Sequence, residues 1–434
     1  MSFSRLPIEL REAVLSDLWP SDLASVSLVS KATLQVARPL LYHSLEFGDC
    51  YNSYDTWADT FASDLMRHLG ASESDIKKAA DAARERAGTA HKKYLESKAR
   101  LLRVLEDCPS LRELVKMIEV HRVDVEPGVI TMDSICTLLK SCRSLRQFEL
   151  SDVDSLDLSR ILDTLSPSVT SLRLENVEIE SRILDTLSPS VTSLILRDVE
   201  IESLAPLVAT LARLSSLETL SLMSVTMKST DVQPRLNLPR LRRLVLLSSS
   251  VQPRTLSTLT IFTPSLASLS ITTSSLLNVD LESLSAVTSL SLHGAQKPRG
   301  QGFDLDDIVA ICRVLEASRK LNRFEWVSNA SSDTSAEVFE RGDLFSRLSP
   351  SIVHLVLDFN LTSSYLVRSL ALDSLQSLQS LVLRRPDERV HPDAKSQRRK
   401  LKRACGDRNV RLEWRRLPGG AKYDDDEEEE EDNQ

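Results

Sequence analysis

A six-residue pattern of apolar and polar positions recurs between residues 115 and 414. With L for any large apolar residue it reads L-x-x-L-x-L, and its last two apolar positions lie two residues apart. Residues at this spacing point to the same face of a β-strand, so each copy predicts a short strand with one buried face. The twelve copies are VKMIEV (115–120), LRQFEL (145–150), VTSLRL (169–174), VTSLIL (191–196), LETLSL (217–222), LRRLVL (241–246), LASLSI (266–271), VTSLSL (287–292), LNRFEW (321–326), IVHLVL (352–357), LQSLVL (378–383) and a degenerate last copy, NVRLEW (409–414).

The copies are spaced like the units of a solenoid. Their central apolar residues lie 21 to 34 positions apart, and most gaps fall in or near the roughly 20–29 residues of a leucine-rich repeat. Segments such as SRILDTLSPS predict short helical or irregular returns between the strands. A Leu-rich chain also matches such a template by chance, but twelve ordered copies argue against that alternative. We therefore predict an α/β fold, a curved leucine-rich-repeat solenoid of about twelve repeats over residues 110–417, with a parallel sheet on its concave side.

Residues 159–180 and 181–202 form a tandem duplication in which 19 of 22 positions are identical. A unit that can be copied in tandem must pack only on its neighbours, which is the property of a solenoid. The three differences are Arg173 against Ile195, Glu175 against Arg197 and Asn176 against Asp198. The first two fall on positions that should face the concave surface. Either the copies diverged where a partner binds, or solvent-facing positions drifted neutrally.

The concave surface predicts a binding site for a protein. Strand side chains alternate between faces, so the residues before, between and after the two buried positions point outward. Several of these are apolar and have arginine beside them, as in a protein-binding hot spot, although scattered surface aliphatics are common. The predicted substrate-binding residues are Arg173, Ile195, Arg197, Met223, Arg243, Val245 and Leu247. Many such repeats place Asn or Cys three residues after the second Leu, where this chain has Val153, Val177, Val199 and Val225.

Residues 5–47 predict three short amphipathic helices. Ile8, Leu10, Val14, Leu15 and Leu18 follow helical spacing in the first, which Trp19-Pro20 should end. Ser21 or Asp22 is expected to cap the second helix, and Ser30 the third. The segment YHSLEF (42–47) predicts a strand that joins these helices to the solenoid.

The same segment resembles the F-box, a domain of about a tenth of this chain. The resemblance rests on Leu6, Pro7, Glu9, Leu10, Leu15, Leu18, Asp22, Leu23, Leu28, Val29, Ser30, Lys31, Pro39, Leu40, Leu41 and Tyr42. It implies an F-box over 4–47 that docks on the Skp adaptor of a Skp–cullin–F-box ubiquitin ligase. It also implies that Leu6, Pro7, Leu10, Leu23 and Val29 face the adaptor. The alternative is a helical cap on the first repeat, and both interpretations can hold together.

Residues 48–109 depart from the familiar arrangement of an F-box followed directly by repeats. This stretch is polar and helix-prone, and we predict an inserted helical hairpin whose charges are mostly solvated. The KSQRRKLKR cluster at 395–403 is either a nuclear import signal or a solvated helix face.

Charge and cysteine content place the chain among reduced proteins of the cytoplasm or nucleus. The formal net charge is −8, but Asp424–Asp432 contributes nine acids, so the remainder carries −8 + 9 = +1. Residues 418–434 should be disordered, because they have too little apolar surface to fold. The six cysteines show no CxxC pair, and neither a signal peptide nor a membrane span is expected.

The sequence has no recognisable catalytic motif. A Gly-rich phosphate loop, an HExxH motif and a metal-spaced Cys/His cluster are all missing from it. We therefore expect no enzyme activity, cofactor, metal site or nucleic-acid partner. The predicted function is that of a substrate receptor of a cullin-type ubiquitin ligase, with the Skp adaptor, a cullin and an unidentified protein target as partners. The alternative is a leucine-rich-repeat scaffold or GTPase regulator outside any ligase.

Overall fold

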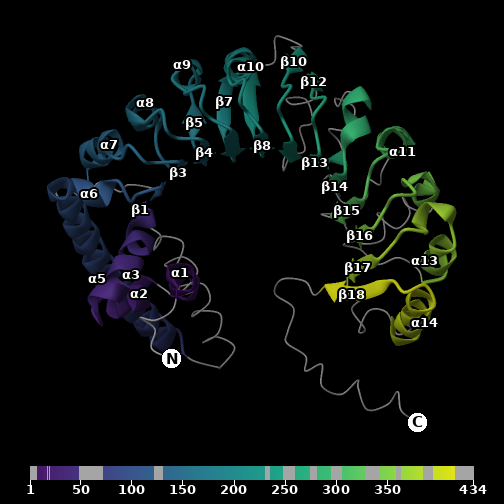
Figure 1. Cartoon of the computed structure of the whole chain (residues 1–434), viewed down its shortest axis with the longest axis horizontal. Helices are drawn as coiled ribbons and strands as arrows, with labels where there is room; N and C mark the ends of the chain where they lie inside the picture. The colour runs from purple at the N-terminus through teal and green to yellow at the C-terminus, as the bar shows by residue number, and fades with distance from the viewer. Residues whose placement is uncertain are drawn as a thin grey trace. The chain divides into compact units, whose positions relative to one another are not determined.

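The computed structural model describes residues 7–16, 18, 20–47, 72–121, 131–229, 235–247, 260–273, 281–294, 305–327, 342–357, 363–384 and 394–415. The chain divides into two compact units, Met1–Val232 and Gln233–Gln434. In each unit the strands line the inner side of a curve and the helices cover its outer side (Figure 1). The predicted disordered segment, 418–434, lies outside the described residues.

The first unit begins with three short helices, α1 (Ile8–Ser16), α2 (Pro20–Ser27) and α3 (Lys31–His43). They share a small core of Leu15, Leu23, Val36 and Ala37. The predicted cap of α3 is confirmed, because the Ser30 hydroxyl accepts a hydrogen bond from the backbone N–H of Thr33 at 3.1 Å. The predicted cap of α2 is wrong. Helix α2 already begins at Pro20, whose fixed φ suits a first helical position, so Ser21 and Asp22 lie inside its first turn.

Six parallel strands form the main sheet of the first unit. They are β1 (Ser44–Phe47), β2 (Met117–His121), β3 (Gln147–Ser151), β4 (Ser171–Glu175), β6 (Ser193–Arg197) and β8 (Thr219–Met223). The register pairs Ile118 with Phe148, Leu172, Leu194 and Leu220 in turn, and all five are at most 1% exposed. The five predicted strands of this unit are therefore confirmed. The YHSLEF strand is confirmed as well, because β1 pairs directly with β2.

The described part of the 48–109 insertion is one long helix, α5 (Glu73–Asp107), followed by the short α6 (Pro109–Arg112). Leu95, Leu102 and Leu105 near the end of α5 are buried, and this end packs against α6 and α7. The insertion thus flanks the first repeats. The other arm of the predicted hairpin would fall on residues 48–71, outside the described residues.

A left-handed residue follows each of four strands in the first unit. Asp152, Asn176, Asp198 and Ser224 have φ between 50° and 56°, a conformation that Asn and Asp tolerate better than most residues. The next residue is valine each time, and these four valines are buried at the place where other leucine-rich repeats carry Asn or Cys. After the turns, β5 (Glu178–Ile179), β7 (Glu200–Ser203) and β9 (Thr226–Ser229) form a second parallel sheet that we had not predicted.

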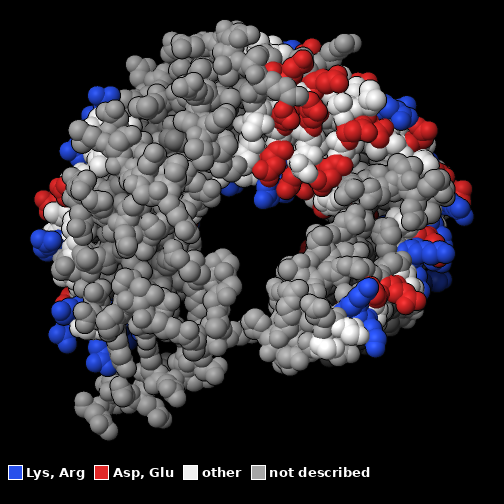
Figure 2. All heavy atoms as spheres, turned by 180° about the vertical axis from the view of Figure 1, so that it is seen from behind, with Lys and Arg blue, Asp and Glu red and all other residues white. Residues whose placement is uncertain are grey.

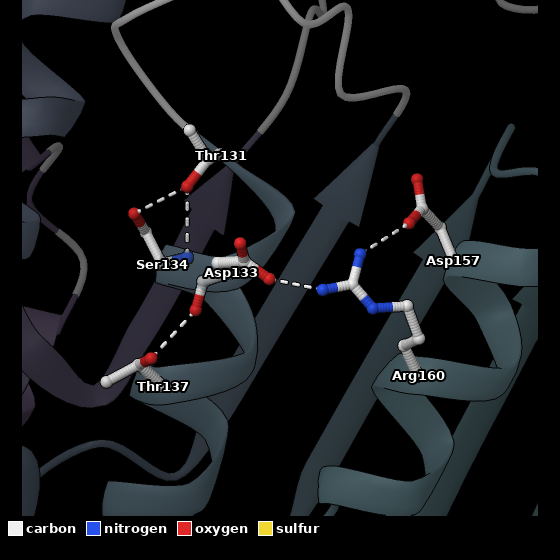
Figure 3. A network of polar contacts seen from close by, with 6 residues as sticks. All are labelled: Thr131, Asp133, Ser134, Thr137, Asp157 and Arg160. Carbon is white, nitrogen blue, oxygen red and sulfur yellow. Dashed lines mark hydrogen bonds and ion pairs between the residues drawn. The ribbon is translucent and has the colours of Figure 1, made fainter.

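Helices α7 (Met132–Ser141), α8 (Ser155–Thr164), α9 (Ser181–Leu184) and α10 (Leu204–Arg213) lie on the outer side of the first unit. Polar contacts join α7 to α8, as Figure 3 shows. The Arg160 guanidinium binds the carboxylate of Asp133 on α7 and lies 3.4 Å from that of Asp157 on its own helix. The Thr131 hydroxyl caps α7 by accepting from the N–H of Ser134 at 3.2 Å. These contacts are largely exposed, so they align neighbouring helices rather than hold the fold together.

The second unit repeats the same architecture. Its parallel sheet contains β11 (Arg243–Leu247), β13 (Ser268–Thr272), β14 (Ser289–His293), β15 (Arg323–Val327), β16 (His354–Leu357), β17 (Ser380–Arg384) and β18 (Arg411–Arg415). These are the seven remaining predicted strands, all in register. A small sheet pairs β10 (Arg235–Asn237) with β12 (Thr260–Phe262). The outer side carries α11 (Leu305–Ala317), α13 (Ser363–Leu370), α14 (Ala394–Gly406) and short 3-10 turns, including η4 (Leu344–Arg347).

Candidate protein-interaction surfaces

The three N-terminal helices keep six large apolar side chains exposed. Leu28 and Val29, in the turn between α2 and α3, are 87% and 76% exposed, and Leu10 on α1 is 53% exposed. Exposed apolar patches of this kind mark interaction sites on soluble proteins. We call the following set the apolar surface of α1–α3: Ile8, Leu10, Val14, Leu28, Val29 and Leu34.

The five predicted adaptor-facing residues are placed differently from one another. Pro7, Leu10 and Val29 are exposed, as that role requires. Leu23 is 6% exposed and belongs to the core of the three helices, so it supports the surface without forming part of it. Leu6 lies outside the described residues. Leu28 is among the residues of the F-box resemblance but not among those predicted to face the adaptor, although it is the most exposed of the large apolar residues of these helices.

Two rows of outward side chains run across the inner face of the first unit. One row places Glu119, Glu149, Arg173, Ile195 and Ser221 on successive strands, and the other places His121, Ser151, Glu175, Arg197 and Met223 there. Both rows follow directly from the parallel register. Ser151 and Ser221 differ from the exposed positions expected for them, because both are buried.

Ion pairs connect the charged members of these rows. The Arg173 guanidinium lies 2.8 Å from the Glu175 carboxylate and 3.5 Å from that of Glu149. Arg197 approaches Glu175 and Asp198 at 3.4 Å each. At the start of the rows, His121 Nδ1 hydrogen-bonds the Ser151 hydroxyl at 2.8 Å. Glu175 therefore lies between two arginines, and both arginines already have carboxylate partners within the chain.

Burial changes the acid–base behaviour of one carboxylate in this network. Partial desolvation raises the pKa of Glu149, and the Arg173 charge opposes that rise. The nearby carboxylates of Glu119 and Glu175 raise this pKa further. The inner face of the first unit is thus a partly dehydrated surface on which each charge affects its neighbours.

Four of the predicted substrate-binding residues lie in the first unit, and the register brings them together. Ile195 pairs with Arg173, and Met223 pairs with Arg197, on adjacent strands. Ile195 and Met223 are half-buried on the inner face. This is the apolar pair flanked by arginines that the sequence suggested, with both arginines held by carboxylates.

The other three predicted residues lie on β11 of the second unit. Arg243 is exposed, while Val245 and Leu247 are half-buried. Next to them, β13 places Ser268 beside Arg243 and Ser270 beside Val245. In this unit the apolar pair is therefore bordered by small hydroxyl side chains on one side.

A neutral polar cluster continues along the inner face of the second unit. His293 Nε2 lies 3.0 Å from the Ser270 hydroxyl and 3.1 Å from that of Ser291. Burial lowers the pKa of His293, and the Glu325 charge on β15 partly opposes this. At neutral pH the imidazole is thus uncharged, and this surface differs from the ion-paired rows of the first unit.

Acidic side chains gather on the face of the first unit seen in Figure 2. The turns and short strands that follow β3, β4 and β6 carry several exposed acids. These are Asp152, Asp154, Glu178, Glu180, Asp198, Glu200 and Glu202. They accompany the left-handed turns, where Asp and Asn are favoured for backbone reasons.

The described residues contain no group of three or more His, Cys, Asp or Glu side chains that could hold a metal ion. Within the same residues, no helix is both long and apolar enough to cross a membrane. The five described cysteines are free, and burial raises the pKa of the Cys142 and Cys405 thiols to about 11.

No family model and no curated protein matches this sequence. Among solved structures, the leucine-rich repeat-containing protein LegL7 from Legionella pneumophila is 14% identical over 71% of this chain and 86% of its own, with a TM-score of 0.33. TLR13 in its ssRNA13 complex is 12% identical over 64% of this chain, with a TM-score of 0.34, and the match spans 48% of the TLR13 chain. A chain of the yeast Rad7 and Elc1 complex is 13% identical over 76% of this chain and 88% of its own, with a TM-score of 0.28.

The fold assignment rests on the chain's own strands. Their parallel order, their register and the burial of both apolar positions in every repeat except the last are those of a leucine-rich-repeat solenoid.

Proposed function

We propose that this protein is a substrate receptor of a cullin-type ubiquitin ligase. Helices α1–α3 bind a Skp-type adaptor, which links the protein to a cullin, and the inner face of the repeats binds a target protein. The protein itself contributes no chemistry in this role. It raises the rate of modification by holding the target close to enzymes supplied by other subunits.

One observation carries this proposal: three helices with their own small core keep six large apolar side chains exposed. A cap that only closed the solenoid would turn its apolar side chains toward the first repeat. Leu28 and Val29 instead lie in a turn with most of their surface exposed. Helix α3 continues directly into β1, so an adaptor bound to the helices would be held firmly relative to the first repeats.

The test is co-purification of the full chain with a Skp-type adaptor. We expect a stoichiometric complex for the natural protein and its loss in Leu28→Asp/Val29→Asp, because a charge in the interface core costs far more than tenfold in affinity. Leu156→Asp is the matched control. Leu156, on α8 of the same unit, is 76% exposed, and its replacement should leave the complex intact.

Two outcomes would contradict the proposal. Equal complex formation by both variants would show that the adaptor does not bind the apolar surface of α1–α3. No complex from well-folded protein would make the helices a solenoid cap and would favour the scaffold or GTPase-regulator alternative.

Target binding is tested separately on the inner face. Met223→Asp in the first unit, and Val245→Asp with Leu247→Asp in the second, should each keep the adaptor complex. We expect at least one of them to lose a target that Leu156→Asp retains. If every target bound by the natural protein is retained by all of these variants, the proposed target surface is wrong.

A further inference from the structure

The outer helix of the last repeat, α14, is strongly basic. Six of its 13 residues are Lys or Arg and none is acidic. From Ala394 to Arg415 the chain has nine basic and two acidic residues, a net charge of 9 − 2 = +7. This stretch is therefore a concentrated positive charge in a chain whose formal net charge is −8.

The packing of α14 turns this charge outward. Leu401 and Cys405 are 2% and 1% exposed and fix the inner face of the helix. The helix packs against α13 and β18, and it lies on the outer side of the unit (Figure 1). Its exposed face carries Arg399, Lys400, Lys402 and Arg403.

The charge of this stretch is one-sided in the sequence. Of its two acids, Glu413 on β18 has its carboxylate 2.9 Å from the Arg411 guanidinium, and Asp407 follows the end of the helix. A net charge of +7 over this stretch attracts polyanions.

The same chain contains a polyanion of suitable length. Asp424–Asp432 is an unbroken run of nine acids, and eight residues, 416–423, connect it to the end of β18. At about 3.3–3.6 Å per extended residue, this connection spans up to roughly 30 Å. Helix α14 is about 20 Å long at 1.5 Å per residue, so the acidic run can reach its whole exposed face.

We propose that Asp424–Asp432 binds the exposed basic face of α14 in the same chain and shields it from other polyanions. A short connection gives the acidic run an effective concentration in the millimolar range, well above that of most competing anions. The attraction is between exposed charges, so added salt weakens it. This inference concerns the second unit alone and does not depend on adaptor binding.

A competition experiment tests the shielding. The probe is a fluorescein-labelled 20-nucleotide oligo-dT, used only as a flexible polyanion. The natural chain is compared with a variant in which each Asp and Glu of 424–432 becomes Asn or Gln. We expect the neutralised variant to bind the probe about tenfold or more tightly at roughly 50 mM salt, with the difference vanishing near 500 mM.

A second variant separates shielding from a general change in net charge. It adds Arg399→Gln, Lys400→Gln, Lys402→Gln and Arg403→Gln to the neutralised acidic run and should lose the gain in affinity. A gain that persists in this variant, or probe affinities of the natural and neutralised chains within about twofold, would overturn the proposal.

Zero-length carbodiimide cross-linking tests the contact itself. We expect a bond between Lys400 or Lys402 and an acid of 424–432 in the monomeric natural chain at low salt, detected by mass spectrometry. Monomer that cross-links elsewhere but never between these two segments would also overturn the proposal.

Discussion

The two copies of the duplication, residues 159–180 and 181–202, differ at positions where the fold places them next to each other. In the parallel register Arg173 pairs with Ile195, and Glu175 pairs with Arg197. Identical copies would have put Arg beside Arg and Glu beside Glu, and like charges on directly neighbouring strands are destabilising. The substitutions instead place Glu175 between Arg173 and Arg197.

The third difference, Asn176 against Asp198, also avoids like charges next to each other. The Asn176 amide donates a hydrogen bond to the Asp152 carboxylate in the preceding turn, and the next turn carries Asp198. An aspartate at 176 would have produced three acids in successive left-handed turns. The three differences between the copies are therefore compatible with charge pairing inside the fold, in addition to any effect on a partner.

Exposure limits this rule. Glu178 and Glu200 are also identical between the copies and pair in register on β5 and β7. Both are exposed, whereas Arg173 and Glu175 are half-buried. Water weakens the repulsion between like charges at such exposed positions. Like charges also occur side by side on the inner face, where the half-buried Glu119 pairs with Glu149 on β2 and β3.

The same residues form helices of different length in the two copies. SRILDT ends the ten-residue α8 in the first copy, but in the second its residues form only the four-residue α9 before the chain turns. The difference lies upstream. Asp154 caps α8 by accepting from the N–H of Asp157 at 2.8 Å, while the equivalent Glu178 begins strand β5.

The largest expected effect is a loss of stability when a buried leucine that both copies share is shortened. Leu172 and Leu194 occupy the same core position and are 1% and 0% exposed. We expect Leu172→Ala and Leu194→Ala each to lower the free energy of unfolding by about 2–5 kcal/mol and to differ by less than about 1 kcal/mol. Urea unfolding measures both, and a clearly larger difference would mean that the two cores are not equivalent.

A smaller loss of stability is expected when the three differing residues of the first copy are replaced by those of the second. Arg173→Ile/Glu175→Arg/Asn176→Asp removes both ion pairs of Arg173, puts an arginine beside Arg197 and adds an acid beside Asp152 and Asp198. We expect a loss of about 1–3 kcal/mol, from several pair effects of about 0.2–1 kcal/mol each. In 1 M salt most of it should disappear, because charges are then screened over about 3 Å. A loss independent of salt would exclude the charge explanation.

The helix boundary gives the next prediction. Asp154→Glu installs the residue type of Glu178, which stands at the matching place before the second copy. It should remove the cap of α8 and lower the free energy of unfolding by about 1 kcal/mol. Hydrogen exchange of the amides of residues 155–158 should become faster, while that of Ile161 and Leu162 changes little. Unchanged protection would show that the upstream residue does not decide the helix length.

The smallest expected effect is a change in the pH dependence of stability through Glu149. Desolvation raises the pKa of Glu149, and the charge of Arg173 lowers it. Arg173→Ile should raise this pKa further. Because the protonated acid is then favoured in the folded state, the stabilising contribution is present at low pH and is lost as pH rises through the folded pKa. We expect the variant to lose more stability than the natural protein as the pH rises above the usual range of a carboxylate. Equal pH profiles would mean that Arg173 does not influence Glu149.

The strands were predictable because their signal is local and repeated. Two large apolar residues at i and i+2, with a third apolar residue three positions before the first of them, define the main strands from β2 to β17. In β18 the third position is Asn409, and YHSLEF defines β1. The strands β5, β7 and β9 escaped prediction because they have only two to four residues and form only beside their copies. Their pairing is a property of the stack rather than of any one repeat.

The candidate surfaces were predictable in part. Alternation placed Ile195 and Met223 correctly on the inner face. It could not show that Arg173 and Arg197 are already paired, because that depends on neighbours about one repeat away. Leu23 follows the same apolar spacing as the exposed positions, and only the packing of α2 on α3 makes it a core residue.

The number of repeats in the first unit determines how wide its parallel sheet is. Each additional 22-residue copy would widen the sheet by one strand spacing, about 4.8 Å, while presenting the same inner surface. Unequal recombination between the two copies would therefore move the first and last strands of this unit apart or together in fixed steps. A new copy would be most stable where its inner-face residues are compatible with those of both neighbouring strands.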